Sequence, residues 1–163
     1  MSTPKIDPII PKSLVDAVKE VITIQANVPV RIKNVAALPP NELPGIDIVS
    51  SIGIKEVGLG GTLALCFPKT TFLAIVGKML GESYTEISNE NADAAGELLN
   101  IIYANARVKI NLAGHAFIPA IPTVIYGEKV KISHGDVSLI VRVDCETDCG
   151  SFHLEVSLKK MGD

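Results

Sequence analysis

The sequence predicts an α/β protein of the α+β kind, in which one β-sheet is covered by two long helices. Residues 11–26 and 91–114 place apolar side chains three and four positions apart, which is the spacing of amphipathic helices. Shorter segments rich in Val, Ile and Leu alternate with polar residues, as half-buried strands do. Aromatic residues make up only 4% of the chain and Trp is absent, so aliphatic side chains must build the core, which suits a sheet covered by helices.

Local signals define the individual elements. We expect a third, shorter helix at residues 69–80, which Gly81 ends, while Gly114 ends the long helix. The loop 39–45 is rich in proline, which excludes regular structure there. The expected strands are 28–38, 46–57, 60–68, 121–127, 129–133, 136–146 and 151–159.

The order of these elements predicts how the chain is organised. The 163 residues include 47% apolar and 20% charged side chains, so we expect one globular domain spanning residues 1–163. Each half of the chain has a long helix followed by a β-hairpin with an alternating pattern. This likeness suggests that the domain is an internal duplication.

The composition excludes several classes of partner. The formal net charge is −3 and no segment is basic enough to follow a phosphate backbone, so we do not expect nucleic acid as a partner. No apolar run approaches the ~20 residues of a membrane helix, so we do not expect a membrane partner either. The first residues carry charges and prolines where a signal peptide needs an apolar run, which predicts a cytoplasmic protein.

Cysteine chemistry is weakly supported by the sequence. The three cysteines are too few for a disulfide framework. Cys145 and Cys149 together with His153 have the separations of a metal-binding helix face, but the segment is predicted to be a hairpin. A structural zinc site would also need a fourth ligand. We therefore interpret the thiols as ordinary and expect no metal site.

Two other patterns are also assigned no chemistry. The histidines His115, His134 and His153 fall at a helix end, in a turn and in a strand, and nothing in the sequence groups them. The glycine-rich stretch 58–61 lacks the Lys-Ser/Thr of a phosphate-binding loop and the spacing of a dinucleotide fingerprint. It is predicted to be a hairpin turn.

One row of polar residues on the long helix needs an explanation. Asp93, Glu97 and Asn100 stand at positions i, i+4 and i+7, so a turn of ~100° per residue places them on one stripe. Asp and Asn are poor residues for a helix interior because they compete for backbone hydrogen bonds. Asp93 can be explained by the helix dipole if it lies in the first turn. Asn100 cannot, because it lies in the middle of the helix.

Two interpretations of this row remain open from spacing alone. It can be a solvated helix face, which is the more frequent reason for such a pattern. It can also be an acid–amide pair that enters the site of a partner molecule. A Glu side chain supplies a charge for an ion pair, and an Asn amide supplies a donor and an acceptor that can hold a water molecule in line with an electrophile.

The row resembles a known family signature when Pro122, further along the chain, is added to it. A D-x3-E-x2-N row followed by such a proline is similar to the motif of the CheC/CheX/FliY phosphatases of bacterial chemotaxis. The resemblance covers most of the chain, including segments 60–68, 78–82, 96–100 and 122–124. The row has a single clear copy, so the chain looks most like CheX.

This resemblance implies a CheC-like fold and an enzyme that dephosphorylates a phosphorylated response regulator of the CheY type. Glu97 would pair with the active-site lysine of the receiver, and Asn100 would orient the water that attacks the phosphoaspartate. The receiver supplies the aspartyl phosphate and Mg²⁺, so the chain itself is expected to need no cofactor. Phosphoryl transfer depends mainly on positioning and charge stabilisation, so two well-placed side chains are sufficient.

The resemblance also implies roles for neighbouring residues. Asp93 either assists the pair or belongs to the helix start. Pro122 has a structural role next to the site, because it fixes the start of a strand beside the helix. Arg107 and Asn111 continue the row and are candidates for contact with the partner, although a solvated face explains these two residues at least as well.

A near-copy of the row occurs on the first helix. Asp16, Glu20 and Thr23 have the same spacing, but Thr replaces the amide and is too short to hold a water molecule in the same place. Whether this is a degenerate second site or a chance match stays open.

We therefore predict a phosphatase of the CheX type that acts on a phosphorylated receiver domain. The alternative is a non-catalytic module of the same fold that binds a receiver or a flagellar switch component. A small-molecule hydrolase is disfavoured because no nucleophile or metal constellation is evident. The family's CheX members pair their sheets into homodimers, so we also expect a homodimer, with the alternating C-terminal strands as the pairing edge.

Overall fold

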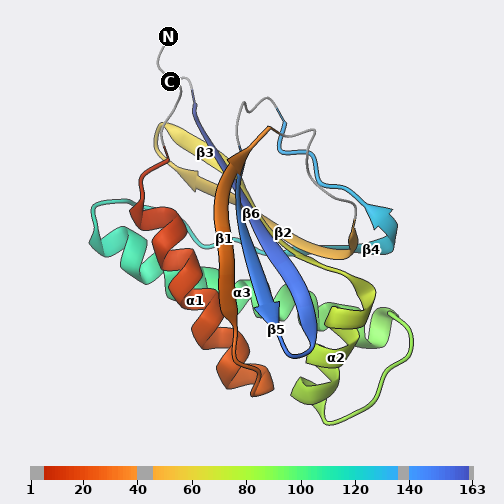
Figure 1. The fold of residues 1–163 in the computed structure, drawn as a ribbon. Coiled ribbons are helices and arrows are strands. Elements are labelled where there is room, and N and C mark those ends of the chain that lie inside the picture. The colour runs from red at the N-terminus through yellow and green to blue at the C-terminus, as the bar shows by residue number, and fades with distance from the viewer. Residues whose placement is uncertain (1–5, 40–45, 136–139, 162–163) are drawn as a thin grey trace.

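The computed structural model describes residues 6–39, 46–135 and 140–161, and it has the predicted α/β architecture (Figure 1). Turn and cap residues explain several element ends. The elements in chain order are α1 (Ile9–Ala26), β1 (Arg31–Leu38), β2 (Ile46–Glu56), β3 (Leu59–Phe67), α2 (Lys69–Leu80), α3 (Asn89–Leu112), β4 (Thr123–Val130), β5 (Ile140–Thr147) and β6 (Gly150–Lys160).

The boundaries of α2 show how local signals set an element. Pro68 precedes the helix in an extended conformation, and Gly81 follows it with a left-handed φ of 70°. The Gly81 N–H donates to the Gly77 carbonyl, so the last turn is closed by a C-cap. The predicted helix at 69–80 is therefore confirmed residue by residue.

The six strands form one antiparallel sheet in the order β1-β5-β6-β3-β2-β4. Each half of the chain supplies one long helix and three strands. Exchanging β1, β2 and β3 with β4, β5 and β6 reverses this order and leaves it otherwise unchanged. The topology thus has the two-fold pattern that an internal duplication produces, with α2 inserted between the halves.

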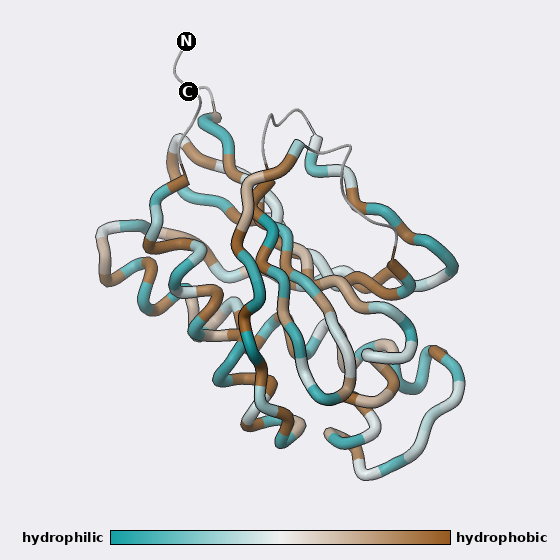
Figure 2. Tube along the Cα trace, viewed as in Figure 1, coloured by the Kyte–Doolittle hydropathy of each residue, from teal (hydrophilic) through white to brown (hydrophobic). Residues whose placement is uncertain are grey.

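One face of the sheet carries all three helices and the main hydrophobic core. α1 packs along α3, and both cover the strands (Figure 1). Apolar and polar stretches alternate along the chain in Figure 2, as expected for elements that bury one side. The largest fully buried side chains are Phe67, Phe72, Ile10, Leu14, Ile22, Ile48, Leu63, Leu65, Ile75, Leu98, Leu99 and Ile102.

The opposite face of the sheet is more polar and has only a small apolar cluster. Ile46, Val49, Ala64 and Cys66 form this cluster, with Val130 and Ile132 packed against it. Residues 131–135, which follow β4, contribute buried His134 to this face, where it contacts β6. We refer to this side as the far face.

The prediction of a second strand at 129–133 is wrong. Lys129 has a left-handed φ of 54°, which interrupts an extended chain, and β4 ends at Val130. The pairing of β4 with β2 also shifts between Ile46 and Ile48, so the end of β4 is irregular. The chain then leaves the sheet, and His134 lies in neither helix nor strand.

Other boundaries differ by a few residues. Helix α3 runs from Asn89 to Leu112 instead of 91–114, and Gly114 follows its end with a φ of 110°. Strand β1 begins three residues later than predicted, at Arg31. The first part of the predicted strand 136–146 lies at 136–139, outside the described residues.

The predicted pairing edge is also wrong. Strand β5 lies between β1 and β6, and β6 lies between β5 and β3, so neither C-terminal strand is free to pair with another chain. The outer strands of the described sheet are β1 and β4. The alternating pattern of β5 and β6 instead reflects a sheet with one apolar face and one polar face.

Candidate active site

The polar row lies on the exposed side of α3. Asp93, Glu97 and Asn100 are all exposed, whereas Leu98 and Leu99, which lie between the last two, are completely buried. The hydrophobic side chains therefore fix the rotation of the helix and force the row toward solvent. Glu97 and Asn100 are three residues apart, which places their Cβ atoms ~5–6 Å from each other.

The observed start of α3 changes the interpretation of Asp93. The helix begins at Asn89 after Ser88, whose backbone N–H donates to Asn91 Oδ1 at 3.0 Å. Asp93 is thus the fifth helical residue, beyond the first turn to which the favourable dipole interaction is confined. Glu90 occupies the first turn. A helix-start role does not account for Asp93.

A shallow, open groove of about 420 Å³ runs beside the row. One wall is α3 and the other is the segment that leads into β4, including Pro122. Among the described residues that line it, there is no Ser, Cys, Thr, His or Lys. The lining residues are Asp93, Gly96, Glu97, Asn100, Ala120, Ile121, Pro122 and Val124.

Gly96 brings the two walls of the groove together, and the sequence analysis missed it. A Cβ atom built on Gly96 would lie 3.0 Å from Val124 Cγ2 and 3.7 Å from Pro122 Cβ. Glycine therefore permits a close approach of α3 to the start of β4. A glycine in a helix interior costs about 1 kcal/mol relative to alanine, so its position inside the row was a usable signal.

Hydrogen bonds hold the second wall in place. Tyr103, in α3, donates its hydroxyl to the Ile118 carbonyl at 2.6 Å. The Ile118 N–H donates to the Lys55 carbonyl in β2 at 3.1 Å. Burial raises the pKa of Tyr103, so its hydroxyl keeps the proton it donates. The segment before Pro122 is thereby fixed to both α3 and the sheet.

His115 adds an ionic brace at the start of the same segment. Its Nδ1 lies 2.8 Å from Glu56 Oε2 and its Nε2 lies 2.9 Å from Asp7 Oδ2. The Ala116 N–H also donates to Glu56 Oε1 at 2.7 Å. Hydrogen bonds that His115 donates to Glu56 and Asp7 raise the pKa of His115, because both carboxylates favour the imidazolium form.

The side chains of the row have no bonding partner among the described residues. Within the described part of the chain, Asp93, Glu97 and Asn100 make no side-chain hydrogen bond or ion pair, although other acids and amides nearby do. The groove therefore presents a carboxylate and an amide to an incoming molecule. Such a pair can bind a cation and orient a water molecule, and the residues that line the groove supply no hydroxyl, thiol, imidazole or amine nucleophile.

The structure gives different roles to Asn111 and Arg107, the two residues that continue the row. Asn111 is engaged within the chain, because its Nδ2 donates to the Phe117 carbonyl at 3.0 Å and its Oδ1 accepts the Phe117 N–H at 2.8 Å. This makes Asn111 a brace for the turn after α3, and we do not propose it as a partner-binding residue. Arg107 is partly exposed, and its buried Nε has no partner among the described residues.

The near-copy on α1 lacks the features of the α3 groove. Asp16, Glu20 and Thr23 are exposed, but the depression beside them is lined by α1 residues. Asp16 pairs with Lys109 at 3.7 Å, and the Thr23 hydroxyl donates to the Lys19 carbonyl at 2.6 Å. The α1 row thus has no amide, no free hydroxyl and no second wall from another described element.

Fold and groove together define an α/β domain made of two helix–three-strand units, with an acid–amide row exposed on its second long helix. The model of the family described as chemotaxis phosphatase CheX matches residues 48–148, which is more than half of the chain, so the chain belongs to this family. The resemblance drawn from the sequence is confirmed.

Solved structures of similar fold cover nearly the whole chain. A CheC-like superfamily protein from Shewanella sp. PV-4 is 25% identical with a TM-score of 0.87, covering 94% of this chain and 99% of its own. Chemotaxis protein CheX from Desulfovibrio desulfuricans is 29% identical with a TM-score of 0.83, covering 92% and 99%. The CheX–CheY–BeF3–Mg²⁺ complex from Borrelia burgdorferi matches at 22% identity and a TM-score of 0.69, covering 96% and 100%.

Two further comparisons complete the description. A search of curated proteins finds no match to this chain. None of the helices that the structure describes is both long enough and apolar enough to span a membrane.

Proposed function

We propose that this protein is a phosphatase that hydrolyses the aspartyl phosphate of a phosphorylated CheY-like receiver domain. The observation that carries the proposal is the exposed, unengaged Glu97–Asn100 pair beside an open groove. An active site for a small molecule usually lies in a concave pocket that encloses its substrate. An exposed pair on a helix fits better into the site of a second protein.

The proposed roles are those that the resemblance to the family implies, and each suits the chemistry of its side chain. Glu97 forms an ion pair with the active-site lysine of the receiver and so fixes the docking of α3. Asn100 accepts a hydrogen bond from a water molecule and orients its oxygen toward phosphorus. As the new P–O bond forms, the bond to the aspartyl oxygen breaks, which releases inorganic phosphate and a free carboxylate. Asp93, one turn before Glu97, assists by favouring cations at the same edge.

Other expectations belong to the same proposal. The Borrelia CheX–CheY complex contains Mg²⁺, which supports a receiver that brings its own metal ion to the reaction. In this view the phosphatase supplies no cofactor to the hydrolysis. Pro122 is a structural residue of the groove wall, and Arg107 is the remaining candidate for contact with the receiver surface. The proposed substrate also implies a cytoplasmic location, and the family suggests a homodimer.

The direct test is the lifetime of a phosphorylated receiver from the same organism. Wild-type protein should shorten this lifetime well below the receiver's own value. Asn100→Ala should lose about 10²-fold or more of the added rate, which is the cost of removing one preorganised polar group. Asn105→Ala is the matched control, because Asn105 is an exposed amide on α3 outside the groove lining.

A second pair of variants tests the acid. Glu97→Gln should lower the rate, whereas Glu20→Gln, at the equivalent position of the α1 row, should leave it unchanged. If wild-type protein binds the phosphorylated receiver without shortening its lifetime, the row is a docking surface. The phosphatase proposal would then be wrong, and the non-catalytic alternative would hold.

A further inference from the structure

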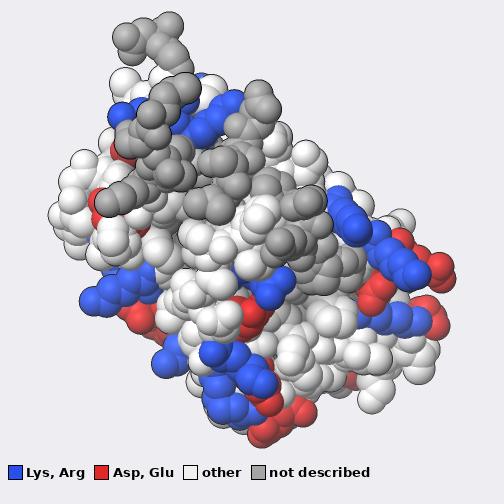
Figure 3. Space-filling view, turned by 45° about the horizontal axis from the view of Figure 1, so that its top comes forward, with Lys and Arg blue, Asp and Glu red and all other residues white. Residues whose placement is uncertain are grey.

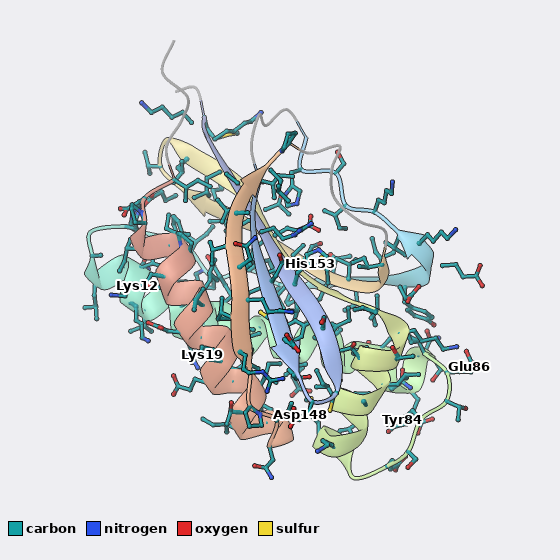
Figure 4. All side chains as sticks on the ribbon, viewed as in Figure 1. Lys12, Lys19, Tyr84, Glu86, Asp148 and His153 are labelled. Carbon is teal, nitrogen blue, oxygen red and sulfur yellow. The ribbon has the colours of Figure 1, made fainter. Side chains whose placement is uncertain are left out.

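The far face of the sheet holds a buried cluster of side chains that the proposed phosphatase reaction does not use. Cys66 on β3 stands directly opposite His153 on β6 in the strand register. Glu155 lies two residues further along β6 on the same face, and His134 covers it from segment 131–135. Figure 4 labels His153 on the sheet. All four residues are at least nine-tenths buried.

This cluster corrects the sequence analysis, which found nothing that groups the histidines. Glu155 Oε1 lies 2.9 Å from His134 Nε2, and Glu155 Oε2 lies 2.7 Å from His153 Nε2. Cys66 Sγ lies 3.5 Å from the same Oε2. The residues come from two strands and a connecting segment, so their proximity depends on the sheet order and is not visible in local spacing.

The rejected set of Cys145, Cys149 and His153 is indeed not a cluster. Cys145 faces the main core, where burial raises its pKa to about 12. His153 pairs across the sheet with Asp144 and faces the other side. The neighbours of His153 on its own face are Glu155 and Cys66.

The far-face cluster contains a buried carboxylate that is held by two histidines. Burial alone would raise the pKa of Glu155, but hydrogen bonds from His134 and His153 outweigh it and hold the pKa at about 2, so the group is a carboxylate. Burial and the neighbouring charge raise the pKa of Cys66, which therefore stays a neutral thiol.

Three possible ligand atoms of the cluster lie close enough together to converge on one metal ion. Cys66 Sγ, a ring nitrogen of His153 and a carboxylate oxygen of Glu155 all lie within 4.8 Å of one another. Tetrahedral zinc with bonds of ~2.0–2.3 Å needs ligand separations of roughly 3.3–3.6 Å. The sulfur–oxygen distance of 3.5 Å already fits. The nitrogen–oxygen distance of 2.7 Å must open by roughly half an ångström, because a metal replaces the shared proton.

His134 occupies the place of an orienting residue behind the ligands. Its Nε2 contacts Glu155 Oε1, the oxygen that does not face Cys66, and its Nδ1 lies 2.9 Å from Ser157 Oγ. Both ring nitrogens are thus fixed. Metal-bound carboxylates commonly have such a partner on the oxygen that does not bind the metal.

We propose that Cys66, His153 and Glu155 form a binding site for a divalent transition-metal ion, with Zn²⁺ as the best fit, and that His134 orients Glu155. A ligand set of sulfur, nitrogen and oxygen selects zinc-like ions over Mg²⁺ or Ca²⁺. Binding releases the thiol proton of Cys66 to solvent, and the proton of His153 moves from Nε2 to Nδ1, so that a neutral imidazole offers its Nε2 lone pair to the metal. The fourth position stays available for a water molecule. The bound ion ties β3 to β6 on the face opposite the phosphatase groove.

The test uses Co²⁺ as a spectroscopic substitute for Zn²⁺ in chelator-treated, full-length protein. Wild-type protein should bind one equivalent of Co²⁺ and develop a thiolate-to-cobalt charge-transfer band together with the visible bands of tetrahedral cobalt. Added Zn²⁺ should displace these bands and raise the Tm. Cys66→Ser should abolish the charge-transfer band, and His134→Gln should weaken binding by about 10- to 100-fold.

Matched controls come from the same chain. Cys149→Ser and Cys145→Ser remove thiols outside the cluster and should keep the cobalt spectrum. X-ray absorption of the zinc-loaded wild type needs no variant, and it should show one sulfur at ~2.3 Å with nitrogen or oxygen at ~2.0 Å. Failure to bind Co²⁺, a shell without sulfur, or a spectrum that persists in Cys66→Ser would overturn the proposal. The cluster would then be a hydrogen-bonded His–Glu–His network.

Discussion

At the scale of single residues, Gly96 permits the short distance between α3 and β4, and Asn100 supplies the amide of the proposed reaction. The site needs both. Gly96 lies beside Glu97, and its missing side chain makes room for Val124 and Pro122. The proposed site therefore combines two polar side chains with one residue whose contribution is space. A search of the sequence for reactive groups does not detect such a residue, because glycine has no side chain.

Gly96→Ala should lower phosphatase activity without unfolding the protein. The new Cβ atom would lie 3.0 Å from Val124 Cγ2, so Val124 in the groove wall must shift by a few tenths of an ångström. Misplacement of an ångström can cost ~10²-fold in rate, so a smaller shift should cost up to about that factor. Alanine is better than glycine in a helix by about 1 kcal/mol, which offsets the strain in the free energy of unfolding.

A compensating variant makes this prediction specific. Gly96→Ala combined with Val124→Ala removes the obstructing methyl group and should recover most of the lost rate. The measurement is the receiver lifetime in the presence of each variant, together with thermal unfolding. If the double variant does not recover the lost rate, Gly96 acts through something other than its distance to Val124.

At the scale of elements, local signals were sufficient wherever a chain segment determines its own structure. Pro68 and Gly81 delimit α2, and the row on α3 follows from helical spacing because buried Leu98 and Leu99 fix the helix rotation. The strand predicted at 129–133 failed because Lys129 adopts a left-handed φ, which β-favouring residues around it do not reveal. Local patterns also do not show which distant segments of the chain pair in the sheet.

The two sites illustrate this limit. Asp93, Glu97 and Asn100 belong to one helix, so their shared face could be predicted from spacing. Cys66, His134 and Glu155 meet only because β3 pairs with β6 and segment 131–135 returns across the far face. Sheet order in a duplicated fold interleaves strands from both halves, and local patterns do not encode that order.

The His115 brace between Asp7, Glu56 and the groove wall should make stability depend on pH. Because its pKa is raised in the folded protein, His115 contributes stability that is complete below the ordinary histidine pKa of 6.5 and is lost as pH rises through the raised value. The lowered pKa of Asp7 acts in the opposite direction, and its contribution is lost as pH falls below about 3.8. The brace should therefore be strongest between about pH 5 and 6.5.

Urea unfolding at pH 6 and pH 9 tests the brace. The free-energy difference between wild type and His115→Gln should be larger at pH 6, by up to about 1 kcal/mol for the half-buried His115–Glu56 pair. Asp16→Asn, which removes an exposed carboxylate paired with Lys109, is the control and should leave the pH dependence unchanged. An equal difference at both pH values would exclude a charged His115 as the source of the brace.

At the scale of the whole molecule, the strand order decides where a second copy can pair. Both C-terminal strands lie inside the sheet, so a dimer formed by sheet extension must use β1 or β4. Figure 3 shows Lys and Arg interspersed with Asp and Glu over the face it presents, so charge on that face does not select one edge. The composition of the two edges does distinguish them.

Both outer strands carry exposed charge, but on β4 it is confined to Glu128 and Lys129 at the irregular end of the strand. Arg31 and Lys33 on β1 are exposed and form ion pairs with Glu146, and exposed charge is a common protection of free edges. Strand β4 exposes Ile125 and Tyr126, at 46% and 39% of their surfaces. Large exposed apolar residues on an outer strand are typical of an interface. We therefore expect the proposed homodimer to form at β4.

Light scattering during size-exclusion chromatography tests this expectation. Wild-type protein should have the mass of a dimer, and Ile125→Lys should shift it toward the monomer, because a charge at the centre of the paired edge would lose its water. Val35→Lys is the matched control, since Val35 is a similarly exposed residue, at 49%, on the opposite edge strand β1. Both changes are at exposed positions, so each folded variant should keep a Tm near that of wild type. Dissociation by Val35→Lys instead would place the interface at β1, and a monomeric wild type would contradict the homodimer altogether.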